Sequence, residues 1–180
     1  MRLILILLIS LNLSADIKDK MLGLYQNAKY EEVCNIGFNN FNRLKRDENY
    51  ISLYAFSCLK SDFIDRLSVP IAMLKFSPEA RANSAYFSII LMQKKLLYHS
   101  LIDEYELSEL NLPTTDYVLS KVFDFYVKLG KHDKRLFYLF EDAKDKKLTY
   151  KLYILKDAGL SKIVIEEFYD TININRHVYW

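Results

Sequence analysis

The chain has 180 residues, with 25 Lys and Arg against 23 Asp and Glu, for a formal net charge of +2. This near-balance, without a clustered basic face, argues against nucleic-acid binding. Only 4 Gly and 3 Pro are present, fewer than the turns of a β-sandwich or a glycine-rich nucleotide-binding fold require. The composition therefore predicts a helical protein.

The first residues predict export. Arg2 precedes an apolar run from Leu3 to Leu13, and Ala15 stands just before a polar segment, which is the layout of a signal peptide. An anchoring helix is the alternative, but this run spans about 16 Å, roughly half of a bilayer core. We therefore predict a signal peptide over residues 1–15, a periplasmic mature chain and no membrane insertion after cleavage.

The rest of the chain divides into segments that resemble paired helices. Candidate hairpins begin at a period of about 33 residues, as expected for stacked helical pairs, near Asp16, Asp47, Glu79, Thr114 and Lys147. We predict an all-α fold, an α-solenoid of about five helical hairpins over residues 16–170. Residues 171–180 form a C-terminal tail whose alternating pattern resembles a strand.

Local signals support these divisions. Ser77-Pro78-Glu79 has the pattern of a helix start, with a capping serine and a proline at the first helical position. Gly130 and Gly159 each follow an apolar stretch, where a left-handed residue ends a helix. Ser161 is expected to cap a last helix over 162–170. The hairpin that begins near Glu79 is expected to break near Lys94-Lys95 or His99. The apolar helical segments 85–98 and 117–129 are predicted to form the centre of the core.

The segment Lys29-Tyr30-Glu31-Glu32-Val33 resembles the start of the second helix of a tetratricopeptide repeat. Val33 replaces the usual small residue, and the Trp and Leu-Gly pair of the first helix are missing. A Sel1-like repeat is the alternative resemblance. Either implies a right-handed superhelix that binds other proteins, and so a scaffold or adaptor in an envelope machine such as a secretion, pilus or flagellar-motor assembly.

Cys34 and Cys58 are the strongest candidate pair. They lie at equal distances from the polar turn between Arg43 and Glu48, which places both side chains at the same height on two antiparallel helices. In an oxidising compartment this arrangement predicts a disulfide. The alternative is two buried thiols that pack as small apolar side chains.

The sequence shows no clear catalytic or metal site. His99, His132 and His177 are far apart and fit no ligand spacing, so we predict no metal and no cofactor. Asp62 and Asp65, beside Arg66, could form a paired-carboxylate site that acts on the cell wall. An ordinary charge pattern at a helix start is the favoured interpretation of these residues.

Aromatic residues are abundant, with 14 Tyr and 11 Phe, and most should pack between helices. Tyr25, Tyr54, Tyr153 and Trp180 are the candidates for partner binding. The tail that ends in Trp180 either docks on the domain or binds a partner. The leading hypothesis is thus a non-enzymatic periplasmic scaffold whose partners are other envelope proteins. The alternatives are a cell-wall-active enzyme or accessory factor using Asp62 or Asp65, and a chaperone for exported clients.

Overall fold

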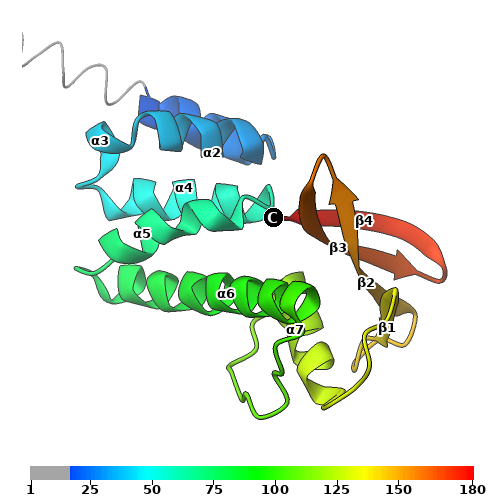
Figure 1. The fold of residues 1–180 in the computed structure, drawn as a ribbon. Helices are drawn as coiled ribbons and strands as arrows, with labels where there is room; N and C mark the ends of the chain where they lie inside the picture. The colour runs from blue at the N-terminus through cyan, green and yellow to red at the C-terminus, as the bar shows by residue number, and fades with distance from the viewer. Residues whose placement is uncertain (1–16) are drawn as a thin grey trace, which may run out of the picture. The chain divides into compact units, whose positions relative to one another are not determined.

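The computed structural model describes residues 17–180, so the predicted signal peptide lies outside the described residues. The fold is α+β: the regular elements between residues 17 and 128 are helices, and a four-stranded antiparallel sheet follows them (Figure 1). The prediction of an all-α solenoid with tetratricopeptide-like or Sel1-like repeats is therefore wrong. The chain splits into two compact units, an N-terminal unit ending at Ser88 and a C-terminal unit over Ile89–Trp180.

The N-terminal unit is helical throughout its described part. Residues 17–26 form a helix, and the elements that follow are α2 Tyr30–Asn39, α3 Phe41–Leu44, α4 Glu48–Lys60, the 3₁₀ helix η1 Ile64–Leu67, α5 Ser68–Met73 and the first part of α6 Pro78–Asp103. The two expected helix starts are confirmed. Asp47 accepts hydrogen bonds from the first turn of α4, and the Ser77 hydroxyl accepts one from Ala80 N–H at 3.0 Å.

Helices α2 and α4 approach closely because Gly37 faces Tyr54. A Cβ atom added at Gly37 would lie 2.5 Å from the Tyr54 ring, so a larger side chain there would push the two helices apart. One turn earlier on α2, Cys34 lies opposite Cys58 of α4 with a Cα–Cα distance of 4.8 Å. The glycine therefore creates the close contact that the predicted disulfide requires.

The Glu48 carboxylate ties the start of α4 to the start of α6. It accepts hydrogen bonds from three consecutive main-chain N–H groups, those of Lys75 at 2.8 Å, Phe76 at 2.7 Å and Ser77 at 2.9 Å. These bonds, that of Phe76 most, lower the pKa of Glu48 to about 2. The carboxylate thus satisfies the N–H groups of the three residues that lead into α6, and it lies at the helix N-terminus, where a negative charge is stabilising.

This interaction predicts acid-sensitive stability. The folded state lowers the pKa of Glu48, so the stabilisation is fully present above the unfolded pKa of 4.5 and disappears as the pH falls towards about 2. Glu48→Gln should lower the urea unfolding midpoint at pH 7, and the difference from the natural chain should vanish near pH 2. Glu31→Gln, at an exposed position in α2, is the control. A pH-independent difference would contradict the assignment.

The C-terminal unit begins with the rest of α6 and with α7 Val118–Lys128. Helix α6 runs unbroken for 26 residues, so the break expected near Lys94-Lys95 or His99 is absent. No glycine or proline interrupts the chain between Glu79 and Asp103, which explains the continuity. Helix α7 ends as predicted: Gly130 has a φ of 63° and its N–H bonds to Val127 O.

The remaining residues form the sheet. Its strands are β1 Phe137–Glu141, β2 Leu148–Asp157, β3 Leu160–Tyr169 and β4 Ile172–Tyr179, in the order β1-β2-β3-β4. Two-residue turns join β2 to β3 and β3 to β4. Ala158 and Gly159 in the first, and Asp170 and Thr171 in the second, all have positive φ, the conformation that matches the twist of a tight hairpin. The sheet is thus a simple meander.

The last predicted hairpin is therefore wrong. Gly159 is a turn residue between strands, and Ser161 lies in β3 rather than capping a helix. The segments on either side of the turn are rich in β-branched and aromatic residues, which pack well on a pleated sheet. The tail is a strand, as its alternation indicated, and it pairs with β3 from Ile163↔Tyr179 to Tyr169↔Ile172.

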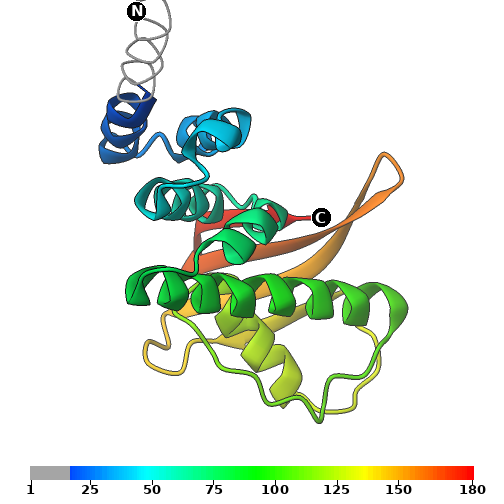
Figure 2. The same ribbon diagram turned by 90° about the vertical axis from the view of Figure 1, so that its left-hand side faces the viewer.

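Helix α7 covers one face of the sheet, which we call the inner face. Phe125 stacks on Phe140 with ring centroids 5.7 Å apart, and Tyr126 contacts Tyr138 edge-to-face at 5.1 Å. Strand pairing places Leu152 and Ile165 on the same face as Tyr138, and both are fully buried. In Figure 2 the helices α6 and α7 lie on the same side of the sheet. This face forms the core of the C-terminal unit.

Candidate functional site

The other face of the sheet, the outer face, is the candidate site. Strand pairing aligns two rows of side chains across all four strands: Phe137, Tyr153, Val164 and Val178 in one, and Leu139, Lys151, Glu166 and Arg176 in the next. Phe137 is 47% exposed and Leu139 is 63% exposed. Within residues 89–180 no helix covers this face (Figure 1). The exposed apolar side chains of this face thus lie on the edge strand β1, whereas Val164 in β3 is fully buried. Exposed apolar side chains grouped in this way are typical of an interaction site.

A charged network crosses the centre of the outer face. The Glu166 carboxylate lies 3.9 Å from Lys151 Nζ and 3.6 Å from Arg176 Nε, and it accepts a hydrogen bond from the Tyr153 hydroxyl at 3.2 Å. Glu166 is mostly covered, whereas the Lys151 and Arg176 side chains are 36% and 45% exposed. Two cations thus surround one carboxylate, and the row presents net positive charge.

Aromatic rings on this face lie beside cations. Lys151 Nζ is 5.3 Å from the ring centroids of both Phe137 and Tyr153. Lys162 Nζ is 5.3 Å from that of Trp180, which is 52% exposed. Cations held over rings order both groups before a partner arrives. The outer face therefore combines Trp, Tyr and Arg, the residue types enriched at binding hot spots.

The four aromatic residues predicted to bind partners do not form one site. Tyr153 and Trp180 belong to the outer face, whereas Tyr25 and Tyr54 belong to the N-terminal unit. Tyr54 is 3% exposed and packs against Gly37, so it is a core residue. Tyr25 contacts Tyr30 edge-to-face at 5.1 Å. The structure thus places two of the four candidates on one surface.

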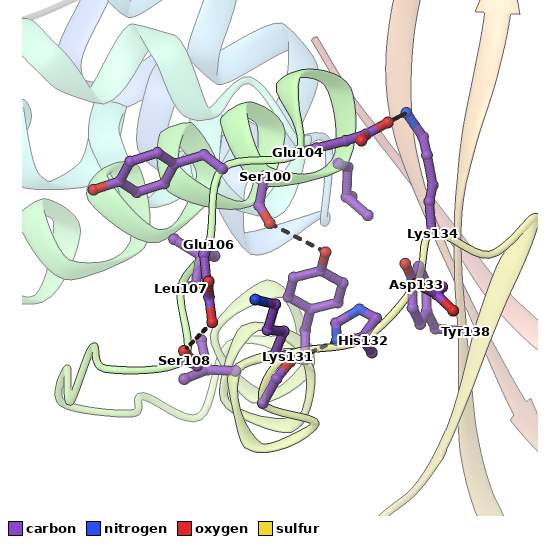
Figure 3. A pocket seen from close by; sticks show the side chains of 15 residues that line it. Ser100, Glu104, Glu106, Leu107, Ser108, Lys131, His132, Asp133, Lys134 and Tyr138 are labelled. Atoms are coloured by element: carbon purple, nitrogen blue, oxygen red, sulfur yellow. Dashed lines mark hydrogen bonds and ion pairs between the residues drawn. The ribbon is translucent and has the colours of Figure 1, made fainter.

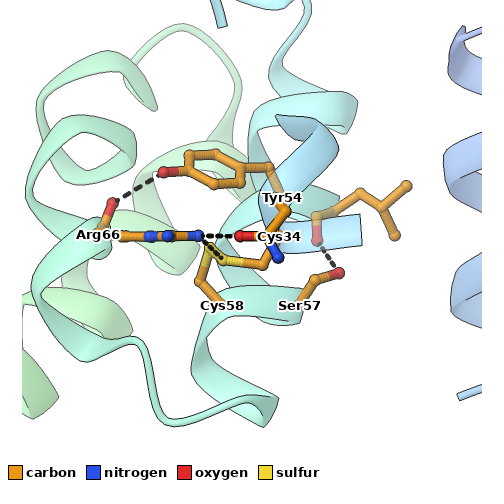
Figure 4. Close-up of a disulfide and its surroundings, with 7 residues drawn as sticks. Cys34, Tyr54, Ser57, Cys58 and Arg66 are labelled. Atoms are coloured by element: carbon orange, nitrogen blue, oxygen red, sulfur yellow. Dashed lines mark hydrogen bonds between the residues drawn. A yellow bond between two sulfur atoms is a disulfide. The ribbon is translucent and has the colours of Figure 1, made fainter. Parts of the chain in front are cut away.

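The predicted Cys34–Cys58 disulfide is present and fully buried. Figure 4 shows the Arg66 guanidinium beside it: Nη1 lies 3.3 Å from Cys34 Sγ and donates to Asn35 Oδ1 at 2.8 Å. Arg66 also stacks on Phe63, 4.5 Å from the ring centroid. Arg66 therefore belongs to the packing of the bridge. This position argues for a structural role and against the wall-active site that the sequence allowed here.

Asp62 and Asp65, the other members of that hypothetical site, lie at a helix connection. Asp62 has a φ of 62° in the turn after α4, and Asp65 is an exposed residue of η1. Residues 17–180 contain no group of three or more His, Cys, Asp or Glu that could hold a metal ion. Among the same residues, no helix is long and apolar enough to cross a membrane.

A small polar pocket lies between the end of α6 and the loop before β1 (Figure 3). Its volume is about 230 Å³, below the usual size of ligand sites. The Ser100 hydroxyl bonds to the Tyr126 hydroxyl at 3.1 Å, and His132 Nδ1 bonds to the Gly130 carbonyl at 2.7 Å. The Ser100 hydroxyl is thus paired with Tyr126 and not with His132, so these two residues do not form a nucleophile–base pair.

His177 is a structural residue of the inner face. Its Nε2 lies 3.0 Å from Glu167 Oε1, and this hydrogen bond lowers the pKa of Glu167. Close by, the Tyr150 hydroxyl donates to Asp142 at 2.8 Å. Burial, and then this bond, raise the pKa of Tyr150 well above its usual range. His99 pairs with Asp103 on the surface of α6, so the three histidines remain apart.

Sequence reasoning missed Lys151, Glu166 and Arg176. Each was hidden in a segment interpreted as helix or tail, and the three come together only through strand pairing. The alternation Tyr150-Lys151-Leu152 was the available signal, because a polar residue between two apolar ones is typical of a strand with one open face.

The fold and the outer face define an α+β protein with an open antiparallel sheet. Comparison with protein-family models, curated proteins and solved structures finds no match to this chain.

Proposed function

We propose that this chain is exported and acts outside the cytoplasm as a non-catalytic protein that binds an envelope protein through the outer face of its sheet. The leader and the buried disulfide support export, because disulfides persist in oxidising compartments. The single observation that carries the binding role is the exposed part of this face, where Phe137 and Leu139 lie beside the network of Lys151, Tyr153, Glu166 and Arg176, and where Trp180 is exposed after β4.

The charges on the outer face indicate which charges the surface of the partner should carry. Lys151 and Arg176 oppose one central carboxylate, Glu166, whereas Lys162 is paired with Asp157 at 2.7 Å. A partner that offers acidic side chains around an apolar patch would match this distribution, since complementary potentials set specificity and speed association. The aromatic side chains lose little conformational freedom when they are covered, so they supply most of the affinity.

Site-specific photo-cross-linking in cells tests the proposal. A photoreactive residue at Leu139 should capture one dominant envelope protein, whereas the same residue at Leu22, which is 48% exposed in the N-terminal unit, should not. Trp180→Ala or Arg176→Glu should reduce capture at position 139 at least tenfold, the effect of losing about 1.4 kcal/mol of binding energy.

Other outcomes would overturn the proposal. Capture of many unfolded clients would indicate a chaperone, and recovery of glycan fragments would indicate a wall-active protein. Equal capture at positions 22 and 139 would show that the outer face is not the binding surface. Intact, unprocessed chain in the cytosol would contradict export.

A further inference from the structure

A groove beside the end of β2 forms a second candidate site, which adjoins the outer face and shares Tyr153 with it. Strand β1 begins at Phe137, opposite Tyr153, but β2 continues to Asp157. The chain bends at Leu136 and leaves the line of the sheet. Residues 154–157 therefore have β3 on one side and no strand on the other. In Figures 1 and 2 the tip of the β2–β3 hairpin extends beyond the other strands.

The open side of β2 carries unpaired main-chain groups. Asp157 and Leu160 flank the two-residue turn, and residues in this position form a hydrogen-bonded pair. Asp157 and every second residue before it in β2 therefore direct their main-chain N–H and C=O groups towards β3. The residues in between direct these groups to the opposite side of β2. The Leu148 carbonyl, which accepts from Asp142 N–H at 2.9 Å on the β1 side, fixes the same alternation. Ile154 and Lys156 consequently face the open side, where no main-chain bond joins them to another described residue.

A cavity of about 480 Å³ adjoins this edge. Leu101 and Ile102 of α6, with Tyr138 and Ile154, form apolar parts of its wall, and Lys134, Arg135 and Lys156 line it as well. No Asp or Glu is among the lining residues. Lys134 also pairs with Glu104 at 3.2 Å across an exposed bridge, which leaves Arg135 and Lys156 as the principal cations of the groove.

We propose that this groove binds an extended peptide segment of a partner, one that alternates acidic and apolar side chains, by adding it as a strand to residues 154–157 of β2. Free strand edges pair readily with extended chains, and main-chain hydrogen bonds then supply affinity while alternate side chains supply specificity. Charge complementarity sets the chemistry of the occupant: cations without a neighbouring acid among the lining residues favour carboxylates, and the apolar wall takes the alternate residues.

The proposal is tested on the full-length mature protein with a fluorescent octapeptide of alternating leucine and aspartate. We expect saturable binding and slower amide hydrogen exchange at Ile154 and Lys156. Arg135→Glu and Lys156→Glu should each weaken binding at least tenfold. Lys146→Glu, the same charge change at an exposed loop position outside the groove, should have little effect.

A second probe separates strand addition from simple charge attraction. The same octapeptide with alternate amides N-methylated keeps its charge but loses the main-chain donors on one side, and it should bind at least tenfold more weakly. Equal affinity of both peptides would overturn strand addition. Absence of binding, or an equal loss with Lys146→Glu, would overturn the site. Trp180→Ala tests the outer face independently, so failure there and failure here are distinguishable.

Discussion

Removal of the Cys34–Cys58 disulfide is expected to lower the free energy of unfolding of the N-terminal unit by about 3–4 kcal/mol. The bridge closes a loop between residues 24 apart in sequence, and a cross-link of this length restricts the unfolded chain by that amount in the chain-entropy model. For a unit of this size the loss corresponds to about 15–25 °C in Tm.

The measurement compares the oxidised protein, with and without reductant, to the double variant Cys34→Ala with Cys58→Ala. Thermal unfolding followed by far-ultraviolet circular dichroism should show the same lowered transition for the reduced protein and for the variant. Reductant should not affect the variant, which provides the control. Free thiols at both positions in exported protein, detected by mass spectrometry, would contradict the bridge.

Leu152→Ala is expected to destabilise the C-terminal unit by about 2–5 kcal/mol, because it removes a fully buried side chain from the inner face of the sheet. Leu139→Ala is the matched control: it makes the same chemical change in the adjacent strand, at a side chain that is 63% exposed on the outer face. We expect it to change stability by no more than about 0.5 kcal/mol.

The fluorescence of Trp180, the single tryptophan, reports on unfolding of the C-terminal unit in urea. The pair of variants also tests the strand assignment, because the two faces of a strand differ in burial at alternate positions. Equal effects of the two substitutions would contradict the register in which Leu152 pairs with Tyr138.

The parts of the fold that sequence reasoning predicted correctly depend on local chemistry. Ser77 caps α6 and Gly130 ends α7, because capping and left-handed ends involve only neighbours along the chain. The Cys34–Cys58 pair was also accessible, since two helices joined by a short turn bring symmetric positions together. These predictions required no knowledge of distant contacts.

The last third of the chain was misassigned because the pattern allowed two interpretations. The run Val164-Ile165 is fully buried in the sheet, and continuous apolar stretches do not distinguish a strand from a buried helix. The Ala158-Gly159 pair was the decisive signal, because two residues with positive φ between alternating segments form a hairpin turn. It was interpreted instead as a helix end, and the regular spacing of the segments favoured that choice.

The sequence by itself determined where α4 and α6 begin, where α7 ends and which cysteines pair, because these depend on residues close in sequence or related by a single turn. Tertiary structure alone decided that Lys151, Glu166 and Arg176 share one face. It also decided that β2 continues beyond β1 and leaves Ile154 and Lys156 unpaired on one side. Strand pairing joins residues that are distant along the chain, and its register is set by which face is buried. Which face is buried is decided by the packing of the helices on the sheet, and the sequence of a single strand does not determine that packing.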